Sequence, residues 1–233
     1  MAARNHDIAA IVFDLDDTLY PEIQYVRSGF RAVARELANP GVGQSVEQVL
    51  DMLLYTYRTG ARDRVFNVVL EQLGRRSDAQ VIRGLVRTYR NHQPTLQLDP
   101  VVSRTLADLK RTHKLGLLSD GYLPAQRLKF EALRLGYFFE HVLFTEALGR
   151  EYWKPHPRGF ELTAKALGVG HEQIAYVADN PAKDFVAPNR LGWLTVQVNL
   201  PSRVHVPKAP TSAHCAHLTI PSVDRLYDIV AGL

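Results

Sequence analysis

The regular alternation of strand-like and helix-like segments over residues 95–233 limits the fold more than any other feature of the sequence. Short apolar runs, which we predict to be strands, lie at residues 114–118, 141–144, 174–178, 194–198 and 217–220. Apolar residues at three- and four-residue spacing predict helices at residues 101–111, 124–135, 157–167, 183–191 and 223–230. Alternating strands and helices favour a parallel sheet with right-handed crossovers and helices on both faces.

The first apolar run, residues 8–13, is followed by a different pattern. Helical periodicity then dominates, and the helices that it predicts are residues 22–37, 46–57, 65–73 and 78–91. The sequence therefore predicts an α/β fold, with a doubly wound, Rossmann-like parallel-sheet core and an inserted all-helical domain. We expect the core at residues 1–20 and 95–233 and the helical insert at residues 21–94.

The charge and the cysteine content exclude several classes of protein. Lys and Arg together number 28 and Asp and Glu together number 24, so the net charge is only +4, and the basic residues are scattered. A nucleic-acid partner is therefore not expected, whereas a small phosphorylated metabolite fits the mildly basic charge. A single cysteine, Cys215, excludes an internal disulfide framework and is typical of a reducing compartment.

The apolar runs are all short. None approaches the length of a membrane span, and residues 8–13 are too few for the apolar part of a signal peptide. We therefore expect a cytoplasmic protein that has no membrane partner. The sequence does not predict an oligomeric state.

Two carboxylates follow the first predicted strand. Asp14 comes directly after residues 8–13, and Asp16 lies two positions further on. In an open parallel sheet, ligands gather outside the carboxyl ends of the strands. Asp14 could attack phosphorus there, and Asp16 could protonate the leaving oxygen and later take a proton from water. An Asp-rich turn without a catalytic role would have the same pattern.

Two later motifs offer groups that bind phosphate. Ser119, Asp120 and Gly121 follow a predicted strand, and a hydroxyl and free backbone N–H groups at such a position can hold phosphate oxygens. Lys154 lies just before a predicted helix, where a fixed ammonium group would neutralise both the nucleophile and the phosphate. Taken alone, each of these motifs fits an ordinary turn or a solvated surface charge equally well.

The last motif carries two carboxylates. Asp179 ends a predicted strand and Asp184 begins the following helical segment. Combined with Asp14, they would form the oxygen-only site that Mg²⁺ prefers. An aspartate in a turn and another in the first turn of a helix is the ordinary structural alternative. Four such motifs in order, each at a strand end, favour the catalytic interpretation.

These motifs together resemble those of the haloacid dehalogenase-like superfamily. The matching positions are Asp14, Asp16, Thr18, Ser119, Lys154, Asp179 and Asp184. The resemblance covers nearly the whole chain, and the helical insert resembles the α-helical cap of the subgroup that contains phosphoglycolate phosphatase and beta-phosphoglucomutase. One departure is Ala178, where the superfamily more often has glycine, and it adds only a methyl group.

The resemblance implies how the reaction would proceed. It implies a phosphatase that hydrolyses a small-molecule phosphomonoester through a phosphoaspartate, with Asp14 as nucleophile and metal ligand. Asp16 would be the acid and base, and its backbone carbonyl would also reach the metal. Lys154 would act in catalysis and bind phosphate.

The resemblance also implies the binding groups. Ser119 and the backbone N–H of Asp120 would bind phosphate. Asp179 would ligate Mg²⁺, and Asp184 would support the metal directly or through water. Thr18 would brace the loop that follows the nucleophile.

Asp16 decides between two activities of this superfamily. Members that cleave carbon–halogen bonds lack an aspartate at this position, because halide needs no proton, so Asp16 favours phosphate ester hydrolysis. A sugar-phosphate mutase shares all four motifs and stays open as an alternative. A non-catalytic binding protein of the same fold is a further alternative, although such proteins usually lose one of the motif carboxylates.

The helical insert carries three arginines that could contact the leaving group. Arg58, Arg62 and Arg64 flank a predicted helix break, where they would bind a second phosphate, a carboxylate or a sugar. Arginines on a solvated helix face are the ordinary alternative. Tyr176 and Trp193 are expected to be packing residues of the core.

Overall fold

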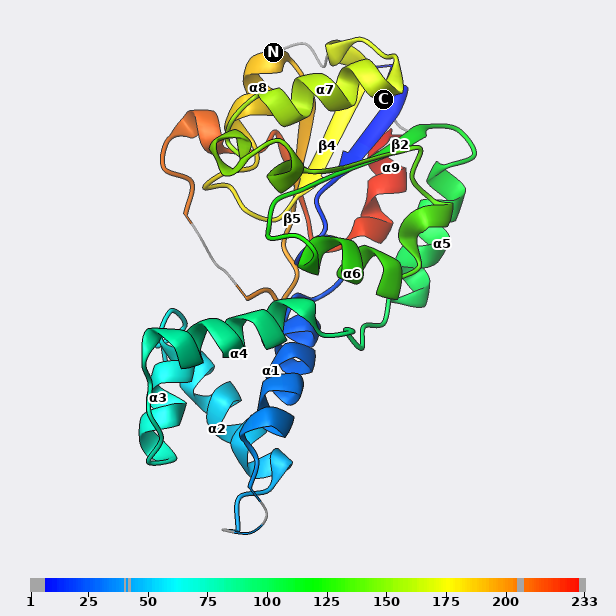
Figure 1. Cartoon of the computed structure of the whole chain (residues 1–233). Coiled ribbons are helices and arrows are strands. Elements are labelled where there is room, and N and C mark those ends of the chain that lie inside the picture. Colours follow the sequence, from blue (N-terminus) through cyan, green and yellow to red (C-terminus); the bar gives the residue numbers. More distant parts are fainter. Residues whose placement is uncertain (1–6, 40, 42, 205–207, 231–233) are drawn as a thin grey trace. The chain divides into compact units, whose positions relative to one another are not determined.

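The computed structural model describes residues 7–39, 41, 43–204 and 208–230. The chain divides into two compact units (Figure 1). The larger unit comprises Met1–Ile23 and Gln97–Leu233, and the smaller unit comprises Gln24–Leu96. That the smaller unit acts as a cap domain stays a prediction.

The larger unit is built on a six-stranded sheet with the order β3-β2-β1-β4-β5-β6. The strands are β1 Ala10–Phe13, β2 Lys114–Ser119, β3 His141–Phe144, β4 Ile174–Ala178, β5 Leu194–Val198 and β6 Leu218–Ile220. Each strand is parallel to its neighbours, which confirms the predicted doubly wound α/β core. Phe13 pairs with Leu117 and Val177, so the residue after β1 lies between the ends of β2 and β4.

Helices cover both faces of this sheet. They are α5 Pro100–Leu109, α6 Ala125–Ala132, α7 Arg158–Leu167, α8 Val186–Leu191 and α9 Leu226–Val230. Short 3-10 helices lie at Leu135–Tyr137, Thr145–Ala147, Arg150–Tyr152, His171–Gln173, Ser212–His214 and Val223–Arg225. Figure 1 shows α7 and α8 on one face and α5 and α9 on the other, as right-handed crossovers require.

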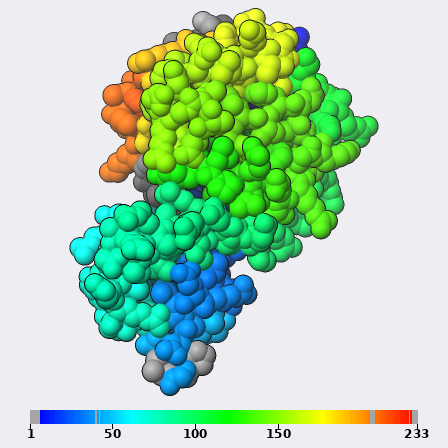
Figure 2. Space-filling view, in the orientation of Figure 1, coloured from blue at the N-terminus to red at the C-terminus, as the bar shows by residue number. Residues whose placement is uncertain are grey.

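The central strand is buried on both faces. The four residues of β1 have no solvent exposure, which explains why their sequence is a continuous apolar run and not an alternating one. Phe160 of α7 packs edge-on against two rings of the core. Its ring centroid lies 5.0 Å from that of Tyr176 and 5.6 Å from that of Trp193. Figure 2 shows that atoms of the green and yellow segments form most of the visible surface of the larger unit.

The described part of the smaller unit is helical, with α1 Ile23–Leu37, whose first residue belongs to the larger unit, α2 Val46–Arg58, α3 Val65–Gln72 and α4 Ala79–Asn91. Ser45 and Gln48 form a capping box at the start of α2, and Asp78 caps α4. Phe30 is central to the packing, because its ring contacts Tyr57 and Tyr89. The helical periodicity of the sequence therefore corresponds to a self-contained apolar interior.

None of the helices in the described part of the chain is long and apolar enough to cross a membrane.

Candidate active site

The ends of the three central strands bring the predicted site residues together. Asp14 follows β1, Ser119 ends β2 and Asp179 follows β4. The backbone N–H of Asp14 donates to the carbonyl of Val177 at 2.9 Å, which extends the sheet pairing to the site itself. All three polar side chains are buried. The parallel topology therefore brings Ser119 and Asp179 beside Asp14, although each is more than a hundred residues from Asp14 in the sequence.

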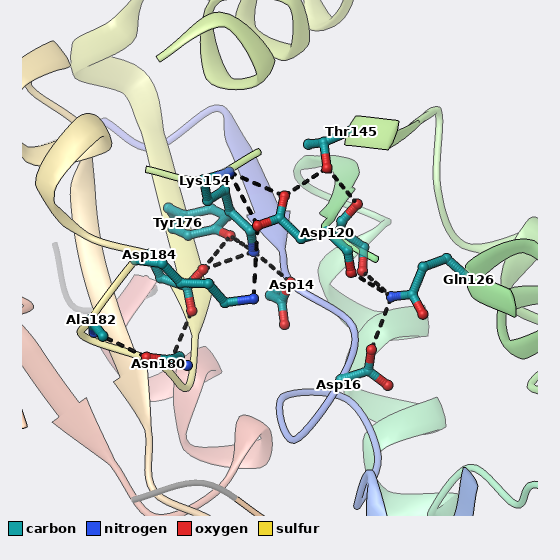
Figure 3. Close-up of polar contacts among 12 residues, drawn as sticks. Asp14, Asp16, Asp120, Gln126, Thr145, Lys154, Tyr176, Asn180, Ala182 and Asp184 are labelled. Atoms are coloured by element: carbon teal, nitrogen blue, oxygen red, sulfur yellow. Dashed lines mark hydrogen bonds and ion pairs between the residues drawn. The ribbon is translucent and has the colours of Figure 1, made fainter. Parts of the chain in front are cut away.

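Lys154 is the centre of the polar network in Figure 3. Its ammonium nitrogen lies 2.6 Å from Asp14 Oδ1 and 2.8 Å from Asp184 Oδ1, and it donates to the hydroxyl of Tyr176 at 3.0 Å. Burial favours the neutral amine, but the carboxylates of Asp14 and Asp184 outweigh it and raise the pKa of Lys154 well above its usual value. The lysine is thus a fixed positive charge beside Asp14.

The carboxylates at this edge crowd one another. Burial raises the pKa of Asp14 to about 6, although Lys154 opposes the shift. Burial, with the added repulsion of Asp184 and Asp14, raises the pKa of Asp179 to about 9. Such mutual repulsion is what a bound divalent cation would relieve, and the donors are the oxygen groups that Mg²⁺ prefers.

The described residues contain no group of three or more His, Cys, Asp or Glu side chains arranged to hold a metal. That finding is compatible with the predicted ligands, since only Asp14 and Asp179 would use their side chains and Asp16 would use its backbone carbonyl. Asp184 also fixes the loop: its Oδ2 accepts the backbone N–H of Asn180 at 2.9 Å. Asp184 therefore holds both Lys154 and the segment that carries Asp179.

Asp16 lies in a separate part of the network. Lys129 Nζ lies 2.8 Å from each of its carboxylate oxygens, and Tyr20 donates to Oδ1 at 2.5 Å. Gln126 donates to Oδ2 at 2.9 Å. Burial alone would raise the pKa of Asp16, but the charge of Lys129 and these hydrogen bonds hold it below its usual value.

The predicted phosphate-binding turn is tied to Lys154 through Asp120. The Asp120 carboxylate accepts the hydroxyl of Thr145 at 2.7 Å and the backbone N–H of Lys154 at 3.1 and 3.2 Å (Figure 3). Ser119 Oγ is buried and accepts a hydrogen bond from Gln126 at 2.8 Å. The side chain of Asp120 thus fixes the loop before α7, a contact that the sequence did not predict.

Asp17 fastens the loop after β1. It has a positive φ of 51°, and its carboxylate accepts the backbone N–H groups of Glu22 at 2.8 Å and Val204 at 2.6 Å. Thr18 was expected to brace this loop. Its hydroxyl is buried and has no hydrogen-bond partner among the described residues. The bracing contacts seen in the structure come from Asp17.

Asp17→Ala is expected to lower the free energy of unfolding by about 2 to 4 kcal/mol, because it leaves one buried and one partly buried N–H group without an acceptor. Chemical denaturation measures this directly. Asp17→Asn is the matched control: it keeps an acceptor oxygen and tolerates a positive φ, so its loss should be clearly smaller. Equal stability of the alanine variant and the native protein would refute this role of Asp17.

The three predicted leaving-group residues lie in the smaller unit. Arg58 ends α2, and Arg62 and Arg64 lie in the turn before α3. All three are exposed, and the guanidinium of Arg62 stacks over the ring of Tyr57 at 4.9 Å. Their role in binding a leaving group stays a prediction.

Several residues of this network were not identified from the sequence as site residues, and four of them contact Asp16 or Lys154. They are Tyr20, Gln126, Lys129 and Tyr176. Tyr176 was expected only to pack, and it does pack against Phe160, but its hydroxyl also contacts Lys154. The sequence does contain an indication for one pair. Gln126 and Lys129 are three residues apart in a predicted helix, so their side chains are expected on the same face of that helix.

Comparison with known proteins identifies the family. Residues 8–192 match the haloacid dehalogenase-like hydrolases. The chain belongs to this family. It is 30% identical to the glyceraldehyde 3-phosphate phosphatase of Methanopyrus kandleri over 82% of this chain and 84% of that protein. It is 29% identical to the glyceraldehyde 3-phosphate phosphatase of Methanocaldococcus jannaschii over 97% and 98% of the two chains.

Solved structures agree on the fold of this haloacid dehalogenase-like chain. The HAD-hydrolase YfnB from Bacillus subtilis, solved with bound magnesium, aligns with a TM-score of 0.69 at 18% identity, over 96% of this chain and 98% of that one. At this identity the likeness concerns the fold alone. Together, the comparisons confirm the predicted family and the predicted enzyme class, a phosphoric monoester hydrolase.

Proposed function

We propose that this protein is a magnesium-dependent phosphatase that hydrolyses a small phosphorylated metabolite through a phosphoaspartate on Asp14. The observation that carries this proposal is the buried contact between Lys154 and Asp14 at the carboxyl end of β1, 2.6 Å long. A fixed ammonium group there neutralises a nucleophilic carboxylate and an incoming phosphate at once. Ser119 on the neighbouring strand supplies a hydroxyl at the same edge.

The metal would be held by Asp14, Asp179 and the backbone carbonyl of Asp16. Bound there, Mg²⁺ would neutralise part of the charge that the phosphoryl group and the carboxylates bring together. Asp184 supports this arrangement through its contacts with Lys154 and the backbone of Asn180. The raised pKa of Asp179 supports a cation site, because a carboxyl in this position keeps its proton when no cation balances its charge.

The proposed reaction has two steps, the formation and the hydrolysis of the phosphoaspartate. In the first, an oxygen of Asp14 bonds to phosphorus, the bond to the leaving oxygen breaks, and Asp16 gives that oxygen a proton. In the second, a water oxygen bonds to phosphorus, the bond to Asp14 breaks, and the proton of the water passes to Asp16. Lys154 and Ser119 hold the phosphoryl group in line during both steps.

The relatives suggest the kind of substrate. Those named above are glyceraldehyde 3-phosphate phosphatases, which supports a three-carbon or similarly small phosphate ester for this chain. A sugar-phosphate mutase would use the same groups but would return the phosphoryl group to a sugar. A cytoplasmic location stays a prediction.

Phosphate release from a panel of esters tests the activity. We expect release from glyceraldehyde 3-phosphate, 2-phosphoglycolate or a related small ester with Mg²⁺, and at least about a 100-fold loss when EDTA removes the metal, because the metal balances transition-state charge. Conversion of β-glucose 1-phosphate to glucose 6-phosphate without free phosphate would favour the mutase. Release that EDTA leaves unchanged would contradict the proposed metal dependence.

A further inference from the structure

The Asp16 carboxylate makes more contacts with buried side chains than a residue in a loop usually does. Lys129 projects from α6 and is 5% exposed at its side chain, while the Asp16 side chain is 19% exposed. The ammonium nitrogen lies 2.8 Å from both carboxylate oxygens, so it contacts the carboxylate symmetrically. Burying a lysine costs free energy unless it is paired, and Asp16 is the partner that compensates for this cost.

Gln126 connects the same carboxylate to the phosphate-binding turn. Its amide nitrogen lies 2.9 Å from Asp16 Oδ2, 2.8 Å from Ser119 Oγ and 2.8 Å from the carbonyl of Asp120. Gln126 is itself buried, and its position three residues before Lys129 puts both side chains on one face of α6. One helix face thus fixes Asp16 relative to the strand end that is proposed to hold phosphate.

We propose that Gln126 and Lys129 are positioning residues that hold the Asp16 carboxylate for proton transfer, chiefly in the hydrolysis of the phosphoaspartate. The inference rests on the proposed function. The contacts of Lys129 with both carboxylate oxygens fix the place and the orientation of the group that accepts a proton from the attacking water. The hydrogen bond from Gln126 adds a second constraint on its orientation.

The two steps place different demands on Asp16. With p-nitrophenyl phosphate, p-nitrophenolate leaves without needing a proton, so the formation of the phosphoaspartate depends little on Asp16. Hydrolysis still requires that a water proton move to the Asp16 carboxylate while water oxygen replaces the Asp14 oxygen on phosphorus. A variant that loses only the positioning of Asp16 should therefore accumulate the phosphoenzyme.

Rapid mixing of the Mg²⁺-loaded enzyme with p-nitrophenyl phosphate tests this inference. Lys129→Met and Gln126→Met should each release about one p-nitrophenolate per active site in a fast burst and then turn over about 10- to 100-fold more slowly than the native enzyme. Asp16→Asn should behave in the same way. Arg127→Met is the matched control, because Arg127 is an exposed cation on the same helix, and it should keep the native steady-state rate.

The possible failures are distinguishable. A native enzyme without Mg²⁺-dependent release of p-nitrophenolate would contradict the proposed function itself. A native enzyme that is active, with Lys129→Met and Gln126→Met variants that turn over normally, would overturn the inference alone. So would variants whose burst and steady state slow equally while their thermal unfolding stays native, because a general distortion of the site would then explain the loss.

Discussion

Asp14→Asn is expected to lower the rate of phosphate release by at least about 1,000-fold, because the amide cannot form the covalent intermediate. Asparagine keeps the shape of the side chain and an oxygen that can accept a hydrogen bond from Lys154. The measurement is the steady-state rate with p-nitrophenyl phosphate and Mg²⁺. A variant with native activity would contradict the assignment of Asp14 as nucleophile.

The stability of Asp14→Asn shows whether its loss of activity comes from the lost nucleophile or from a damaged fold. The pKa of Asp14 is raised to about 6 in the folded protein, so the folded state favours the protonated form more than the unfolded state does. Ionising Asp14 in the metal-free protein therefore costs stability as the pH rises through 6, and asparagine removes that cost. Denaturation at pH 7.5 without metal should find the variant at least as stable as the native protein.

Lys154→Met is expected to lower the free energy of unfolding by about 3 to 5 kcal/mol, because it leaves buried carboxylates without their cation. The side chains of Asp14 and Asp184 are only 4% and 0% exposed, so water cannot replace the ammonium group. Urea denaturation of the metal-free protein measures the loss. The variant should also lose phosphatase activity.

Lys183→Met is the matched control for that experiment. Lys183 belongs to the same site, but its side chain is 34% exposed and its ammonium nitrogen lies 3.8 Å from Asp120 Oδ2. A partly exposed pair of this kind contributes at most about 1 kcal/mol. Equal losses for the two variants would show that the network around Lys154 does not stabilise the fold in the way that we describe.

The sequence predicted the sheet well because its four central strands, β2, β1, β4 and β5, are buried over most of their length. Such strands are continuous apolar runs, so the bounds of β4 and β5 agree with the predicted ones. The start of α8 was less accurate: the helix begins at Val186, three residues later than predicted. The preceding residues form a turn closed by the hydrogen bond from the Asn180 backbone to Asp184, a contact that apolar periodicity does not reveal.

The contacts among the site residues were only partly predictable. Parallel topology puts Asp14 and Ser119 at one edge of the sheet whatever their side chains do. That Lys129 contacts Asp16 depends on how α6 packs, and the two residues are 113 positions apart in the sequence. Such a contact depends on tertiary structure, and helical periodicity indicated only that Gln126 and Lys129 share a face.

The covalent intermediate tests the central claim most directly. The native enzyme is mixed with p-nitrophenyl phosphate and Mg²⁺, quenched in acid within the first turnovers, digested and analysed by mass spectrometry. We predict one phosphoryl group on the peptide that contains Asp14, and none in Asp14→Asn or without Mg²⁺. Phosphate release without a phosphorylated peptide, or a phosphoryl group on another residue of the active enzyme, would contradict the account.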